Sequence, residues 1–202
     1  DIIPKKKKII KKTIKEEKIK LQKPFLKWAG GKTQIIDDIL KYFPRTMENY
    51  HEIFLGGGSV LLALLSLRKN NEITVNNKIY AYDLNPALIN TYNQIKNNHQ
   101  IVINNIKKII DEFSLIKKNT EGQKGKPGNL TESNYKNTRE HYYYWTRDLY
   151  NKSEKNTPLS AAFFIFLNKT GYKGLYREGP NGFNIPYGQK DKKKIPGIIV
   201  ED

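Results

Sequence analysis

Apolar residues recur along the first half of the chain at two different spacings. Steps of three and four residues, which place side chains on one face of a helix, alternate with short apolar runs of strand length. The expected elements are a helix at 35–43, a strand at 50–54, a helix at 59–67, a strand at 78–82 and a helix carrying Leu88, Ile89, Tyr92 and Ile95 on one face. This order is typical of the opening of a doubly wound α/β sheet.

A few residues mark where these helices are expected to begin and end. Thr33 and Ser59 are predicted to cap the first two helices, because a hydroxyl at that position accepts a hydrogen bond from the first turn. Pro44 ends the first helix. Asn85 followed by Pro86 predicts the start of the third.

The second half of the chain predicts a loop, two helices and a hairpin. Residues 119–133 are rich in Gly, Asn, Thr and Lys and indicate a surface loop. A helix is expected at 138–151, and another begins at Pro158 and contains 161–167. The aromatic residues of the first, Tyr142, Tyr143, Tyr144 and Trp145, favour a core, with a base-stacking platform as the alternative. Beyond Asn168, the Gly, Tyr, Arg, Pro and Asn content predicts a hairpin region.

The composition points to a polyanionic partner. The formal net charge is +16 and the mean hydropathy is −0.69. Lys and Arg that neutralise phosphates release counterions, which favours nucleic acid, although AT-rich coding would also enrich Lys, Asn, Ile and Tyr. Residues 1–23 are rich in Lys and are expected to be either a solvated tail or an arm that contacts DNA.

Several classes of site and location are disfavoured. The absence of cysteine excludes disulfides and thiol catalysis, and three histidines make a histidine metal centre unexpected. No apolar run approaches the roughly 20 residues that span a bilayer, and the start lacks a secretory signal. We therefore expect a soluble, intracellular monomer with no membrane partner and no metal. The chain does not begin with Met, so it is expected to be a piece of something longer.

The glycine run 56–58 lies between an expected strand and an expected helix. Glycine is needed where the backbone turns tightly and lets a ligand approach. Asp83, at the end of the next strand, is placed to accept hydrogen bonds from both hydroxyls of an adenosine ribose, or else to cap the turn before Asn85. The spacing F-x-G-x-G differs from the pyrophosphate pattern G-x-G-x-x-G. A nucleoside cofactor without a pyrophosphate fits this spacing better.

Three segments in order resemble the Dam-type DNA adenine-N6 methyltransferase family. They are FLKWAGGK at 25–32, EIFLGGGSV at 52–60 and YDLNPALI at 82–89, with Ile53 in place of the family's usual proline. The resemblance implies a Rossmann-like sheet that binds S-adenosyl-L-methionine. It also implies a role in DNA methylation, including restriction–modification. The cofactor-binding residues it implies are Trp28, Lys32, Phe54, Gly56, Gly58 and Asp83. A lysine suits the cofactor's carboxylate, and an indole face suits its sulfonium.

Residues 166–177 and 182–188 resemble the family's DNA-recognition region, a helical and hairpin insertion that binds double-stranded DNA. Arg177 is the candidate for a guanine or phosphate contact and Tyr172 for a wedge into the base stack, with packing of the hairpin as the alternative. This chain has Lys173 where relatives often carry Asn. The implied DNA-binding residues are Tyr172, Lys173, Leu175, Arg177 and Pro186.

The motif that performs the family's chemistry is absent. The family holds the adenine amine with [D/N/S]-P-P-[Y/F/W], but no Pro-Pro occurs here, and the string at 184–187 resembles the recognition region instead. No catalytic residue is therefore assigned, and a fragment of a longer enzyme is expected, with an inactive binding module or a split subunit as the alternatives. The expected divisions are a tail at 1–23, a cofactor-binding half at 24–118, a target-recognition region at 119–195 and the start of a catalytic half at 196–202. The expected reaction is methyl transfer to N6 of adenine in duplex DNA at a short site, with GATC expected by analogy with the family. A nicotinamide oxidoreductase is the third hypothesis for the function.

Overall fold

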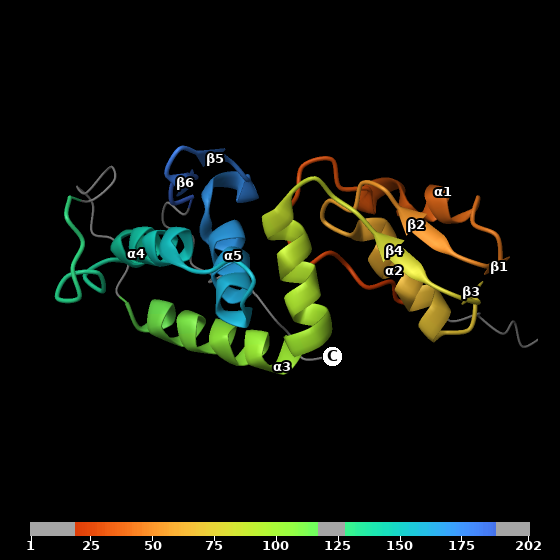
Figure 1. Cartoon of the computed structure of the whole chain (residues 1–202), viewed down its shortest axis with the longest axis horizontal. Coiled ribbons are helices and arrows are strands. Elements are labelled where there is room, and N and C mark those ends of the chain that lie inside the picture. The colour runs from red at the N-terminus through yellow and green to blue at the C-terminus, as the bar shows by residue number, and fades with distance from the viewer. Residues whose placement is uncertain (1–18, 117–127, 189–202) are drawn as a thin grey trace, which may run out of the picture.

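The computed structural model describes residues 19–116 and 128–188. Two groups of elements lie side by side and share one long helix (Figure 1). The first group holds four short strands with helices α1 and α2, and the second holds α4, α5 and a hairpin. Helix α3 (Pro86–Leu115) runs from the first group into the second. Residues 1–18, 117–127 and 189–202, and the expectations that fall on them, lie outside the described residues.

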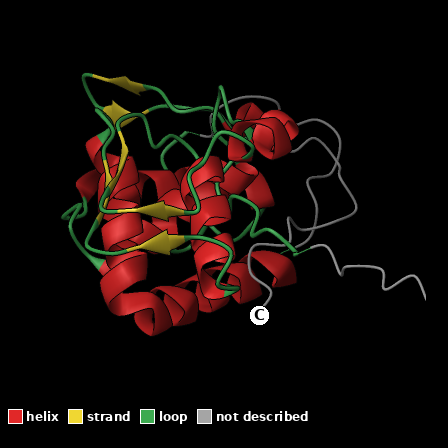
Figure 2. Ribbon diagram, turned by 90° about the vertical axis from the view of Figure 1, so that its right-hand side faces the viewer, coloured by secondary structure: helices red, strands yellow, loops and turns green. Residues whose placement is uncertain are grey.

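The strands of the first group form two short parallel pairs. β1 (Thr46–Met47) pairs with β3 (Thr74–Val75), and β2 (Tyr50–Glu52) pairs with β4 (Ile79–Ala81). In each pair, helix α2 (Ser59–Lys69) lies along the chain between the two strands. Figure 2 shows how short these strands are beside the helices. The expected strands at 50–54 and 78–82 are thus confirmed in shortened form, and the parallel pairing with a helical connection agrees with an α/β fold.

The two faces of the β2–β4 pair differ in character. Ile79 packs on one side against a small core of Leu64, Ile73 and Val75. On the other side, the rings of Tyr80, which lies on β4, and Tyr82, which follows it, stack with His51 of β2. The centroid distances are 4.6 Å for Tyr80 and 6.2 Å for Tyr82. Tyr82 is 44% exposed. Alternation along the strands explains the difference, because successive side chains point to opposite faces.

Two predicted helix caps are wrong. Thr33 does not cap a helix but begins a 3-10 turn (η1, Thr33–Ile35), which continues into the short helix α1 (Ile36–Leu40). Ser59 is the first residue of α2, and the cap position belongs to Gly58. The Ser59 hydroxyl instead accepts a hydrogen bond from the backbone N–H of Lys32, at 3.0 Å. A long-range contact has therefore replaced the local one.

Helix α3 begins as predicted and continues much further. The Asn85 side chain accepts a hydrogen bond from the N–H of Leu88 at 3.0 Å, and Pro86 occupies the first turn. At Asn98 the backbone leaves helical geometry, with φ −138° and ψ 30°, and the helix bends. Its second half carries the buried residues Val102, Ile106, Ile109 and Phe113.

The second group is built around α5 (Pro158–Thr170), a helix buried along most of its length. Phe166 packs edge-on against Phe113 at 5.2 Å and against Tyr142 of α4 (Arg139–Lys152) at 5.9 Å. Tyr143 and Tyr144 are also buried, so these three tyrosines belong to the core as expected. Trp145 is half-buried and stacks on Tyr135 at 5.0 Å.

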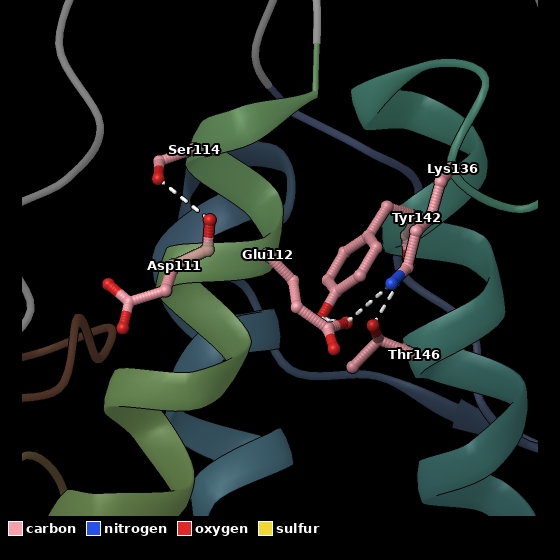
Figure 3. A network of polar contacts seen from close by, with 6 residues as sticks. All are labelled: Asp111, Glu112, Ser114, Lys136, Tyr142 and Thr146. Atoms are coloured by element: carbon pink, nitrogen blue, oxygen red, sulfur yellow. Dashed lines mark hydrogen bonds and ion pairs between the residues drawn. The ribbon is translucent and has the colours of Figure 1, made fainter.

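A polar network ties α3 to α4 at the far end of this core (Figure 3). The Tyr142 hydroxyl donates to the Glu112 carboxylate at 3.1 Å, and the Lys136 ammonium lies 3.6 Å from the same carboxylate. The hydroxyl of Thr146 donates to the backbone carbonyl of Tyr142 within α4, at 2.8 Å. These contacts fix the helices that support the hairpin.

The predicted hairpin region follows α5. A 3-10 turn (η2, Tyr172–Gly174) leads into β5 (Glu178–Gly179), which pairs antiparallel with β6 (Gly182–Phe183). Within residues 19–116 and 128–188, no helix is long and apolar enough to cross a membrane. The same residues contain no cluster of three His, Asp or Glu that could hold a metal ion.

Candidate cofactor cleft and DNA-recognition segment

A cleft of about 820 Å³ opens beside the carboxyl end of β2. This volume lies within the range of roughly 300–1,000 Å³ that is typical of small-molecule sites. Residues from four separate segments line the cleft, including five of the six predicted cofactor residues: Trp28, Lys32, Phe54, Gly56 and Asp83. Segments distant in sequence therefore converge on one concave surface at a strand end, where α/β folds bind their ligands.

Asp83 organises the glycine turn at the floor of the cleft. One carboxylate oxygen accepts a hydrogen bond from the N–H of Gly56, and the other accepts one from the N–H of Asn85, both at 2.9 Å. The second bond is the turn cap considered as an alternative from the sequence. An ionised carboxylate has about four acceptor positions, so two remain for a ligand.

Trp28 lies directly against the glycine turn, and Lys32 lines the same cleft. A Cβ atom on Gly56 would lie 3.2 Å from the indole of Trp28, and one on Gly57 would lie 3.1 Å from the Trp28 Cβ. Glycine is therefore needed for this close approach. Lys32 is exposed, and its ammonium donates to the carbonyl of Gly30 at 2.9 Å. The cleft is thus lined by both a cation, Lys32, and a carboxylate, Asp83.

Gly58, the sixth predicted cofactor residue, does not line the cleft. It is buried with φ +72°, and a Cβ there would lie 2.2 Å from the hydroxyl oxygen of Tyr92. That hydroxyl donates to the carbonyl of Gly57 at 2.9 Å. The start of α2 and the packing of Tyr92 explain why glycine is needed at position 58. Direct contact between Gly58 and a cofactor stays a prediction.

Glu52 also lines the cleft and did not emerge from the sequence. Burial raises the pKa of its carboxyl from 4.5 to about 7, while the hydrogen bond donated by the Tyr50 hydroxyl, at 3.0 Å, acts in the opposite direction. The cleft therefore contains a carboxyl group whose charge changes near neutral pH. The sequence gives no sign of this, because the position of a residue in a strand does not reveal how deeply its carboxyl is buried.

The raised pKa of Glu52 predicts a pH-dependent stability. The folded state holds a proton that the unfolded state releases, so stability falls as pH rises from about 4.5 to about 7. We expect Glu52→Gln to flatten this fall, because glutamine stays neutral. Chemical denaturation at several pH values measures it, with Glu132→Gln, a change at an exposed carboxylate, as the control. A pH profile unchanged by Glu52→Gln would contradict the assignment.

The five predicted DNA-binding residues are all exposed, and they lie within residues 172–188, the candidate recognition segment. Tyr172 and Leu175 are 45% and 43% exposed, and Lys173, Arg177 and Pro186 are exposed as well. The N–H of Tyr172 donates to the carbonyl of Pro186 at 2.9 Å, which places the two ends of the segment together. Lys173 adopts a left-handed backbone with φ +55°, a conformation that Asn tolerates well among non-glycine residues.

Helix α4 holds the returning strand of this segment in place. The carbonyl of Ile185 accepts hydrogen bonds from the Tyr143 hydroxyl at 2.9 Å and from the Arg147 guanidinium at 3.0 Å. The Arg177 guanidinium donates to the Asn184 side chain at 2.7 Å. Asn184 and Ile185 are therefore fixed within the recognition segment.

Two further cations lie beside this segment and were missed from the sequence. Lys169, in the last turn of α5, is half-buried, and burial together with the nearby Lys27 lowers its pKa. Among the described residues, neither lysine has an ion-pair partner. Only the fold brings together positions 27 and 169.

The sequence of residues 28–197 matches the family described as D12 class N6 adenine-specific DNA methyltransferase. The match covers most of the chain and includes both the cleft and the recognition segment. The chain belongs to this family. Membership in the D12 class agrees with the resemblance seen in its motifs.

Curated proteins with similar sequences carry consistent names. The type II methyltransferase M.MjaIII of Methanocaldococcus jannaschii is 36% identical over 181 residues, which cover 86% of this chain and 54% of that protein. A DNA adenine methylase of Vibrio cholerae is 31% identical, covering 91% and 54%. One of Haemophilus influenzae is 34% identical, covering 82% and 47%. This D12 class chain thus spans about half the length of the curated relatives it matches.

Proposed function

We propose that this chain provides the cofactor site and the DNA-recognition surface of an enzyme that methylates N6 of adenine in duplex DNA. The observation that carries the proposal is the cleft in which Trp28, Lys32, Gly56 and Asp83 converge. S-adenosyl-L-methionine supplies an activated methyl group to such a site. Its carboxylate, sulfonium and ribose each have a chemically suitable neighbour in the cleft.

Each residue of the cleft has a proposed partner on the cofactor. Lys32 pairs with the methionine carboxylate, the indole of Trp28 faces the sulfonium, and the free acceptor positions of Asp83 take the ribose hydroxyls. Phe54 is 83% exposed and offers an apolar ring for the adenine. Gly56 presents its backbone to the ligand without a side chain. These interactions bind and orient the methyl donor.

The recognition segment is proposed to hold the DNA. Arg177 presents a planar guanidinium that suits the O6 and N7 atoms of guanine, or a phosphate. Tyr172 is proposed to fill the space left in the base stack when the target adenine leaves the duplex. Lys27, Lys169 and Lys173 supply positive charge for the phosphates.

The reaction itself needs a group that this chain does not contain. As the adenine N6 attacks the methyl carbon, the carbon–sulfur bond breaks and the amine loses a proton. The family's proline-containing motif holds that amine, and no Pro-Pro occurs among the 202 residues. The string at 184–187 is an unsuitable substitute, because Asn184 already bonds Arg177 and the Ile185 carbonyl already accepts two hydrogen bonds. The amine-holding group is therefore proposed to come from polypeptide outside these residues.

Transfer of a labelled methyl group tests the proposed activity. The protein expressed from its gene is incubated with S-adenosyl-L-methionine labelled in the methyl group and with unmethylated duplex DNA. The nucleosides are then separated, and label on N6-methyladenine is the expected result. Label on cytosine, or label on RNA alone, would contradict the proposal. Binding of both ligands without transfer would favour an inactive binding module.

Arg177→Ala is expected to weaken DNA binding without affecting cofactor binding. Loss of a bidentate guanine contact costs about 1–3 kcal/mol, which is roughly 5- to 150-fold in affinity. Fluorescence anisotropy at fixed ionic strength measures the DNA affinity, and calorimetry measures the cofactor affinity. Arg68→Ala, at an exposed position in the last turn of α2, is the matched control. Equal losses in Arg177→Ala and Arg68→Ala would show that only net charge matters.

A further inference from the structure

The buried side chain of Asn168 connects two segments that are assigned to different ligands. Its Oδ1 atom accepts a hydrogen bond from the N–H of Lys27 at 2.8 Å. Its Nδ2 atom donates to the carbonyl of Lys27 at 2.8 Å and to the carbonyl of Gly174 at 3.2 Å. Asn168 is only 3% exposed. A primary amide suits this position because it donates and accepts at the same time.

The two connected segments also pack closely against each other. Lys27 directly precedes Trp28 of the cofactor cleft, and Gly174 lies between Tyr172 and Arg177 of the recognition segment. Gly174 has φ +67°, and a Cβ there would lie 2.5 Å from the Cβ of Lys27. The backbone at Gly174 therefore rests on the Lys27 side chain. A shift of one segment must displace the other, because close-packed groups transmit strain.

The indole of Trp28 provides a second connection between the same segments. Its ring lies 5.7 Å from the ring of Tyr176 in the recognition segment and 6.4 Å from that of Phe164 in α5. The residue proposed to face the sulfonium thus touches the segment proposed to hold DNA. Asn168 fixes the backbone on which this contact depends.

We propose that Asn168 is a positioning residue that couples the two binding sites, so that cofactor binding and DNA binding strengthen each other. This inference rests on the proposed function, since it assumes that both ligands bind. A ligand that orders one segment also orders the other through Asn168, so the second ligand pays a smaller entropic cost. The coupling is reciprocal, as thermodynamic linkage requires.

The coupling is measured with ligands that bind without reacting. S-adenosylhomocysteine replaces the methyl donor, and the DNA is the duplex that the protein selects from a randomised pool. DNA affinity is measured with and without saturating S-adenosylhomocysteine at fixed salt. In the unaltered protein, we expect S-adenosylhomocysteine to strengthen DNA binding at least about fivefold, within the usual range of coupling between sites.

Asn168→Ala is expected to reduce this factor to nearly one, although each ligand still binds alone. Thr146→Val is the matched control, because Thr146 is equally buried but its hydroxyl bonds only within its own helix. We expect Thr146→Val to keep the full coupling factor even where it lowers stability. A purely structural role for Asn168 would instead leave the coupling factor unchanged in Asn168→Ala.

Asn168→Asp tests the donated hydrogen bonds separately. When ionised, the introduced carboxylate accepts from Lys27 but cannot donate to the carbonyls of Lys27 and Gly174, so coupling is lost.

The possible outcomes are distinguishable. If both ligands bind but neither affects the other in the unaltered protein, the inference is wrong while the proposed function stands. If coupling persists in both Asn168 variants, Asn168 does not carry it. If neither ligand binds the unaltered protein, the proposed function fails, and the inference fails with it.

Discussion

Asp83→Ala is expected to weaken the binding of S-adenosyl-L-methionine by roughly 10- to 150-fold. Loss of a charged hydrogen-bonding partner costs about 1.5–3 kcal/mol, and each factor of ten in affinity corresponds to about 1.4 kcal/mol. The structure adds a second reason for a large effect. Asp83 also holds the N–H groups of Gly56 and Asn85, so its removal loosens the floor of the cleft.

Two other variants separate these contributions. Asp83→Asn keeps the shape of the side chain and one acceptor oxygen, so it should retain more of the turn than Asp83→Ala does. Asp111→Ala removes an exposed carboxylate on α3 and should leave the affinity unchanged. Titration calorimetry gives the three affinities, and circular dichroism shows whether each variant is folded. Unchanged affinity in folded Asp83→Ala protein would remove Asp83 from the cofactor site.

Gly58→Ala is expected to lower the free energy of unfolding by about 2–5 kcal/mol. A left-handed conformation costs an alanine roughly 1–2 kcal/mol, and overpacking adds about 1–3 kcal/mol. The added methyl group would lie 2.2 Å from the Tyr92 hydroxyl oxygen and 3.0 Å from Cζ of the same ring. Denaturant unfolding measures the loss of stability.

Two other glycines divide the effect into its parts. Gly30→Ala carries the backbone strain alone, because Gly30 has φ +74° and no atom within 4 Å of its Cβ position. At Gly128 there is neither a left-handed backbone nor a crowded Cβ position, so Gly128→Ala should change the free energy of unfolding by less than about 0.5 kcal/mol. Combining Gly58→Ala with Tyr92→Phe removes the hydroxyl that meets the new methyl group, so the two losses should be less than additive. Additive losses would show that Tyr92 is not the obstacle.

Local patterns in the sequence predicted the framework of the candidate cofactor cleft. The glycine turn follows a strand and Asp83 follows the next strand, so chain order alone placed them at the same sheet end. Asn85 and Pro86 marked the start of α3 for the same reason, since a capping bond spans only three residues. Features set by neighbouring residues could be predicted in this way.

Features set by distant residues could not be predicted. The Ser59 hydroxyl is bonded to Lys32, so the local expectation of a cap failed. The raised pKa of Glu52 arises from burial, which depends on the packed fold. Asn168 bonds to Lys27, 141 positions away, and Lys169 meets the same lysine. Each of these features depends on a contact that appears only once the chain has folded.

Titration calorimetry of the chain with S-adenosyl-L-methionine tests the central claim most directly, with NADH as the competing nucleoside cofactor. We predict saturable binding of S-adenosyl-L-methionine at one site, reduced at least about tenfold by Asp83→Ala and by Lys32→Ala, with Arg177→Ala unchanged. NADH should give no saturable heat, because the F-x-G-x-G spacing does not form a pyrophosphate site. Binding of NADH without binding of S-adenosyl-L-methionine would contradict the account.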